Sequence, residues 1–89
     1  MSTLPRINMK ATGENIKNLR EKNGYSVHDL QTKLGLATAQ AIYKWQQGAT
    51  LPDIMNLLAL SELFHVPVAD ILVCDFPSNI KPLHIHRKP

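Results

Sequence analysis

The sequence has few of the features that support catalysis, membrane insertion or disulfide bonding. Cys74 is its only cysteine, so an internal disulfide cannot form and a disulfide-stapled fold is excluded. No stretch of about 18 apolar residues is present and the N-terminus lacks an apolar signal core, so we expect a cytoplasmic protein without a membrane segment. Paired acidic motifs, glycine-rich phosphate loops and nucleophiles with a matched partner are also absent. We therefore expect no enzyme, no cofactor and no small-molecule substrate.

What is present is the composition of one small folded domain. A chain of 89 residues is of single-domain length, and its 44% hydrophobic and 19% charged residues argue against a disordered chain. We expect an N-terminal arm at residues 1–12, a folded domain at residues 13–73 and a basic, proline-containing tail at residues 74–89.

Charge is unevenly distributed along the chain. Residues 1–44 carry seven basic and three acidic side chains, whereas residues 45–75 carry four acidic side chains and no basic one. The remaining residues carry three basic side chains, and the net charge is +3. A basic segment at residues 1–44 and an acidic one at residues 45–75 would orient the molecule toward a polyanion. A solvated surface with uneven charge explains the same distribution.

The pattern of glycines and apolar residues predicts five helices. Gly24, Gly35 and Gly48 each follow a helical pattern, as expected of glycines just past a helix C-terminus. Ser26 and Asp29 have the spacing of a capping box at the start of the second helix. We expect an all-α five-helix bundle without strands, with helices at about residues 13–23, 27–34, 38–47, 53–64 and 67–73.

The fourth predicted helix is the most apolar. Eight of its twelve positions are apolar, so we expect it to be buried nearly all round, with the other helices packed on it. Trp45, Met55 and Phe64 are expected in the core, and Cys74 is expected to be a small buried hydrophobe.

The third predicted helix has two distinct faces. At 100° per residue, one face carries Thr38, Ala41, Ile42 and Trp45 and should face the core. The opposite face carries Gln40, Tyr43, Lys44 and Gln47. Glutamine and lysine suit the base edges of DNA, although any helix of a small domain has a polar outer face.

The order of these motifs resembles the helix-turn-helix domain of the phage repressor and Cro family. The resemblance covers residues 13–73 and is carried by "LREKNGYS", "IYKWQQG" and the "LP" that follows. It implies a lambda-repressor-like fold and a prokaryotic or phage transcriptional regulator, most simply a repressor that occupies a double-stranded DNA operator and so associates with the nucleoid.

The resemblance also implies roles for individual residues. It places the helix at residues 38–47 in the major groove, with base contacts from Gln40, Tyr43, Lys44 and Gln47. DNA backbone contacts are implied for Ser26, Thr38, Ala39, Thr50 and Arg20.

Several positions depart from the family pattern. Gln46 stands where the family usually has an acid that pairs with the arginine matching Arg20, so Arg20 either hydrogen-bonds Gln46 or is free to reach phosphate. Val27 replaces a frequent phosphate-binding glutamine, and residues 49–51 offer one hydroxyl where basic residues are common. We therefore expect weak binding by a monomer and a homodimer on DNA, with an interface at the loop before residue 53, the fifth helix or the tail.

Two function classes remain open. The exposed polar set on the third helix favours a DNA-binding regulator, whereas the missing basic residues after Gly48 favour an interaction module that has lost DNA binding, such as an antitoxin. The tail could form a short edge strand at residues 83–86 or remain a mobile basic segment. No metal site is expected, because its candidate ligands are too dispersed: His65, Cys74, His84 and His86.

Overall fold

The longest element is helix α1 (Met9–Lys22), in a computed structural model that describes residues 4–76. Asn8 caps it, because its side-chain oxygen accepts a hydrogen bond from the Ala11 N–H at 2.9 Å. The predicted start near residue 13 is wrong, since Gly13 lies inside the helix. Half of the expected N-terminal arm therefore belongs to α1 and to a short strand, β1 (Arg6–Ile7).

The next three helices lie close to their predicted positions. Helix α2 (Val27–Leu34) begins and ends as predicted, and Gly35 ends it in the left-handed conformation at φ 69°. Helix α3 (Gln40–Gln47) starts two residues later than predicted. Helix α4 (Ile54–Phe64) starts after Asp53, whose carboxylate accepts a hydrogen bond from Asn56 N–H at 2.8 Å and is therefore the N-cap.

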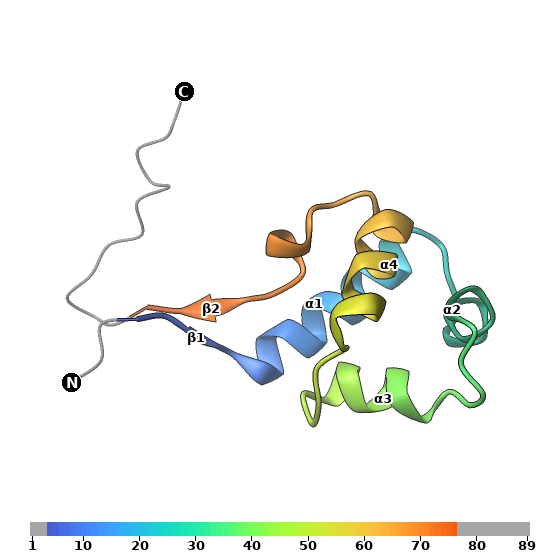
Figure 1. The fold of residues 1–89 in the computed structure, drawn as a ribbon, viewed down its shortest axis with the longest axis horizontal. Coiled ribbons are helices and arrows are strands. Elements are labelled where there is room, and N and C mark those ends of the chain that lie inside the picture. Colours follow the sequence, from blue (N-terminus) through green and yellow to red (C-terminus); the bar gives the residue numbers. More distant parts are fainter. Residues whose placement is uncertain (1–3, 77–89) are drawn as a thin grey trace.

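The predicted fifth helix is wrong. Only a 3₁₀ turn, η1 (Val68–Asp70), forms there, and the chain then extends into strand β2 (Cys74–Asp75), which pairs antiparallel with β1. A helix through residue 73 would need the Val73 N–H for the carbonyl of Ala69, but this N–H donates to Thr12 Oγ1 at 2.9 Å instead. The carbonyls of Asp70 and Ile71 accept from Asn15, and the carbonyl of Val73 accepts from the Asn8 N–H. The described chain therefore has four α-helices and a two-stranded ribbon that projects from the helical body (Figure 1).

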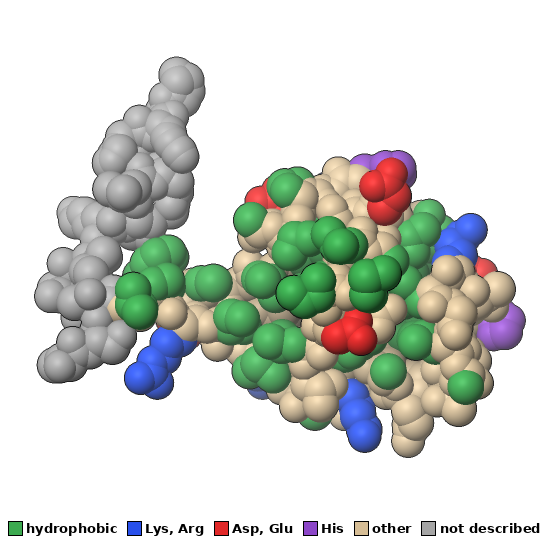
Figure 2. Space-filling view, viewed as in Figure 1, with side chains coloured by type: hydrophobic (Ala, Val, Ile, Leu, Met, Phe, Trp, Pro, Cys, Tyr) green, Lys and Arg blue, Asp and Glu red, His purple; other side chains and the backbone are tan. Residues whose placement is uncertain are grey.

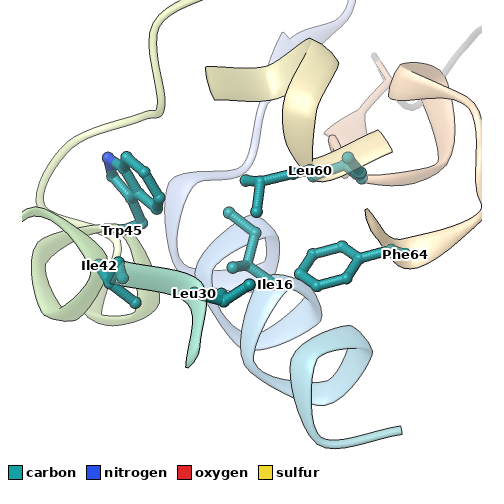
Figure 3. Close-up of a cluster of buried hydrophobic side chains, with 7 residues drawn as sticks. Ile16, Leu30, Ile42, Trp45, Leu60 and Phe64 are labelled. Atoms are coloured by element: carbon teal, nitrogen blue, oxygen red, sulfur yellow. The ribbon is translucent and has the colours of Figure 1, made fainter. Parts of the chain in front are cut away.

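The core draws one or two side chains from every helix. Its buried members come from all four helices and from the residue that follows η1, and they form one cluster (Figure 3): Ile16, Leu30, Ile42, Trp45, Leu60, Phe64 and Ile71. Trp45 and Phe64 are buried as predicted. At about 1.5–3 kcal/mol for each large apolar side chain, this cluster is the main source of stability for so small a domain.

Helix α4 is not buried all round. Ile54, Met55 and Leu58 expose 72%, 74% and 56% of their surface, so the prediction of a core position for Met55 is wrong. Only the face that carries Leu60 and Phe64 contacts the core, and no other described segment covers the opposite face.

A row of polar side chains on α1 holds the C-terminal part of the described chain. Asn8 donates to the Asp75 carboxylate at 3.3 Å, and Asn15 donates to the carbonyls of Asp70 and Ile71 at 2.8 and 3.0 Å. Between them, the buried hydroxyl of Thr12 accepts from the Val73 N–H at 2.9 Å. Spaced along one side of the helix, these side chains fix residues 70–75 against α1.

Candidate nucleic-acid interface

Helix α3 is pressed directly against α1, and this contact fixes the direction in which α3 faces. Gly13 is buried in α1, and a Cβ placed on it would lie 2.6 Å from the carbonyl oxygen of Gln46 and closer still to that of Trp45. Only a residue without a side chain allows the two backbones to approach so closely. Together with the buried side chains of Ile42 and Trp45, the contact leaves the opposite face of α3 pointing outward.

Arg20 ties α3 to α1 and to the start of α2. Its Nε donates to Gln46 Oε1 at 2.9 Å, and its Nη1 donates to the Tyr25 carbonyl at 2.9 Å. Of the two alternatives left open above, the structure therefore has the Arg20–Gln46 hydrogen bond. The Arg20 side chain is only 11% exposed and also lies 3.7 Å from the Glu21 carboxylate, so its geometry does not support the expected phosphate contact.

The outward face of α3 carries the four side chains predicted to read bases. Gln40, Tyr43, Lys44 and Gln47 are all exposed, and no side-chain hydrogen bond within the described chain engages them. Tyr43 exposes 47% of its surface although it is aromatic. The face thus presents two amides, a phenol and an ammonium group, which together can donate to and accept from base edges.

The turn before α3 differs in part from the prediction. Thr38 is exposed rather than packed toward the core, and its hydroxyl accepts from the Gln40 N–H at 3.3 Å. Ala39 is half-buried at the N-cap position, where it makes no side-chain capping bond. Thr38 is therefore placed at the edge of the exposed α3 face.

The N-terminus of α2 provides backbone donors. The predicted capping box is confirmed, because Ser26 Oγ accepts from the Asp29 N–H at 2.9 Å and the Asp29 carboxylate accepts from the Ser26 N–H at 2.8 Å. This second hydrogen bond is the main reason that the pKa of Asp29 lies below its ordinary value. The N–H groups of Val27 and His28 are left without a partner within the described chain, at the positive end of the helix dipole.

Lys10 was missed by the sequence analysis. The segment after α3 has exposed Ala49 and Thr50 but no basic residue. However, a Cβ on Gly48 would lie 2.9 Å from the Cα of Lys10, so the first turn of α1 abuts this segment and brings an exposed lysine to it. The position of Lys10 was not predicted because residues 1–12 were expected to form an arm rather than the start of a helix.

Neither a metal site nor a membrane span is found in the part of the chain that the structure describes. No group of three His, Cys, Asp or Glu side chains could hold a metal ion among residues 4–76, and no helix there is long and apolar enough to cross a membrane. Cys74 is exposed on β2 rather than buried, which corrects the prediction. His84, His86 and the predicted alternatives for the tail lie outside the described residues.

Two short helices joined by a tight turn, with the second held by its apolar face and polar on its outer face, define a helix-turn-helix protein. Residues 16–71 match the family described as "Helix-turn-helix", and the chain belongs to this family. The resemblance inferred from the sequence motifs is thereby confirmed.

One relative comes from Thermococcus gammatolerans, and its name places it among HTH-type transcriptional regulatory proteins. The two are 31% identical over 77 residues, which cover 83% of this chain and 24% of the relative. The chain thus spans about a quarter of that protein's length.

Two solved structures share the fold. The restriction-modification controller protein C.AhdI from Aeromonas hydrophila superposes with a TM-score of 0.62 at 19% identity, over 71% of this chain and 94% of that protein. The DNA-binding domain of BldD also gives a TM-score of 0.62, at 23% identity over 82% of this chain and 100% of that domain.

Proposed function

We propose that this protein binds double-stranded DNA sequence-specifically, with α3 in the major groove, and regulates transcription. The observation that carries the proposal is the outward face of α3. Its four polar side chains are exposed while Ile42 and Trp45 anchor the opposite face, as a helix that reads base edges requires.

Each exposed side chain of α3 has a role that follows from its chemistry. Gln40, near the start of the helix, can bond adenine N6 and N7 with its amide, and Lys44, one turn later, can reach guanine O6 and N7. Tyr43 and Gln47 flank them and can contact a thymine methyl group, a base edge or a sugar.

Contacts to the DNA backbone would come from both sides of this face. On one side, a phosphate would bind the Ser26 hydroxyl and the N–H groups of Val27 and His28 at the start of α2. On the other side, Thr50 and Lys10 flank the end of α3. Thr38 and Ala39 lie at the start of α3, whereas we assign Arg20 to positioning α3 rather than to phosphate binding.

The regulatory mechanism that fits best is repression by operator occupancy as a homodimer. Two copies would double the phosphate and base contacts on half-sites one helical turn apart. The name of the Thermococcus relative supports a regulatory role, and the low number of basic residues after Gly48 makes a second copy necessary for tight binding.

A second candidate function is a protein-interaction module with weak or lost DNA binding. The exposed apolar face of α4, formed by Ile54, Met55 and Leu58, favours this candidate, because monomers rarely expose apolar patches of this kind without a partner.

Selection from a random duplex library at two salt concentrations separates the two candidates. We expect enrichment of a palindromic motif, which Gln40→Ala and Lys44→Ala each relax at one position at a cost of about 1–3 kcal/mol. Lys10→Ala is the matched comparison, since loss of a phosphate contact should weaken all sequences equally and lower the salt slope by about 1. Retention without a motif, or a motif unchanged by both α3 variants, would refute base reading by α3, and no retention would favour the interaction module.

A further inference from the structure

The β1–β2 ribbon has a hydrogen-bonding pattern that leaves its outer edges unpaired within the described part of the chain. Arg6 lies opposite Asp75 and Ile7 lies opposite Cys74, and the Asn8 N–H donates to the Val73 carbonyl at 2.7 Å. In an antiparallel pair, hydrogen-bonded and non-hydrogen-bonded residue pairs alternate. The backbone N–H and C=O groups of Ile7 therefore point outward from the β1 edge, and those of Cys74 point outward from the β2 edge.

The two edges differ in their capacity to accept another strand. On the β1 edge, the same alternation directs the backbone of Pro5 outward, and proline has no N–H to donate. On the β2 edge, Cys74 and Phe76 direct their backbone groups outward, and neither has a hydrogen-bond partner among the described residues. Proline is a common device that blocks strand addition, so β1 is protected and β2 is open.

The open edge is also held in place, and no other segment among residues 4–76 covers it. Asn8 binds the Asp75 carboxylate, and Thr12 binds Val73 just before the strand, so β2 is ordered before any partner arrives. All four strand residues are exposed, and Phe76 exposes 42% of its surface. An isolated two-stranded ribbon is only marginally stable in water, and pairing with a further strand increases its stability.

We propose that a second copy of this chain pairs with the β2 edge, antiparallel and about a two-fold axis. The product is a four-stranded sheet with the two β2 strands in the middle and the two β1 strands outside. This inference deepens the proposed function and rests on it, because it supplies the interface of the proposed homodimer. A second copy fits because antiparallel pairing of a strand with itself is two-fold symmetric and closes after two chains.

Charge selects the register of this pairing. Centring the two-fold axis on Asp75 would place two carboxylates directly opposite each other, which destabilises a sheet. Centring it on Cys74 places Asp75 opposite an apolar residue, Val73 of the second copy. Each Asp75 then keeps its opposite charge, Arg6, as its neighbour within its own ribbon. The two Cys74 residues face each other as a hydrogen-bonded pair.

Further apolar area lies on the side of the molecule that carries the ribbon and α4. Hydrophobic side chains run from the ribbon toward α4, where Ile54, Met55 and Leu58 are exposed (Figure 2). These three side chains form an exposed apolar patch on one face of α4, of the kind that often marks a contact with another protein. A stable interface needs about 800 Å² from each copy, which is more than the edge of a two-residue strand offers, so we expect the α4 patch to contribute to the contact.

The single cysteine makes the proposal directly testable without DNA. In the Cys74-centred register, the two Cα atoms lie about 5.5 Å apart, within the roughly 4.4–6.8 Å that a disulfide spans. We expect mild oxidation of the full chain to give a covalent dimer in high yield at concentrations where sedimentation shows a dimer. A dimer that oxidation does not cross-link would overturn the register, and a monomer at all concentrations would overturn the interface.

Two proline substitutions provide a matched test of the edge. Cys74→Pro removes the outward N–H of β2, so we expect the dimer dissociation constant to rise at least about tenfold. Ile7→Pro makes the same change on the edge that Pro5 already blocks, and should leave the dissociation constant within about twofold. Cys74→Ser controls for loss of the thiol, and circular dichroism confirms folding of each variant. Equal effects of the two proline variants, or none from Cys74→Pro, would refute pairing through β2.

Failure of this inference is distinguishable from failure of the proposed function. The Gln40→Ala/Lys44→Ala variant changes only the exposed face of α3, so it should sediment and cross-link as the wild type does. A wild type that dimerises through β2 but selects no DNA motif would leave the interface intact and refute only base reading.

Discussion

Substitution of Gly13 by alanine tests how α3 is positioned. Helix propensity alone predicts that Gly13→Ala stabilises α1 by about 1 kcal/mol. The structure predicts the opposite sign, since the new Cβ would lie 2.6 Å from the Gln46 carbonyl oxygen and closer still to that of Trp45. A C···O contact needs about 3.3 Å, so α1 and α3 must separate by roughly 0.7 Å or more.

The expected cost exceeds the gain in propensity. Overpacking costs about 1–3 kcal/mol, and here the upper end applies because both contacted atoms belong to the backbone and cannot rotate away. We therefore expect a net loss of about 2 kcal/mol in the free energy of unfolding. For a domain of this size, that is a fall of about 8–16 °C in melting temperature.

Urea unfolding followed by circular dichroism measures this difference. Trp45, the only tryptophan, provides a second signal, because separation of α3 from α1 should shift its fluorescence to longer wavelength. Asn18→Ala is the control, since Asn18 is exposed on the same helix and its replacement should raise stability by about half a kcal/mol. If Gly13→Ala were as stable as the wild type or more stable, the close approach of the two helices would be refuted.

Three further predictions concern stability. Trp45→Ala should cost about 3–5 kcal/mol by opening a cavity, which urea unfolding would reveal, and a variant as stable as the wild type would contradict its burial. Thr12→Val should cost about 1–3 kcal/mol in the same assay because the Val73 N–H loses its acceptor, and a neutral effect would contradict that bond. The pKa of Asp29 is lowered by the Ser26 N–H, so its contribution to stability is present above about pH 4 and is lost as pH falls through the lowered pKa. The stability difference between wild type and Asp29→Asn should therefore shrink below about pH 4, and a constant difference would refute this linkage.

The features that could be predicted from the sequence are those encoded by residues near one another. Helix α2 was located correctly because Ser26, Asp29 and Gly35 lie within ten residues of one another and act on its own ends. The outward face of α3 followed from 100° periodicity, and its exposure is confirmed by the structure. Whether those side chains read bases stays a prediction.

The features that were missed depend on residues far apart in the sequence. Gly13 resembled a helix boundary, but it is a contact point with residues 45 and 46. The two strands have two residues each, too few for any periodic signal, and they form because Asn8 and Thr12 hold residues more than 60 positions away. The apolar composition of α4 could not separate a core face from an exposed one, since both are apolar.

The polar row on α1 has a consequence for the order in which the domain is completed during synthesis. Asn8, Thr12 and Asn15 bind partners 67, 61 and 55 residues later in the chain. A ribosome releases α1, α2 and α3 before it releases those partners, so the three helices can assemble while α1 still lacks them. Such long-range contacts close late because the intervening chain must first be ordered. The nascent domain therefore reaches its final rigidity only when the segment through Asp75 has emerged and closed onto its beginning.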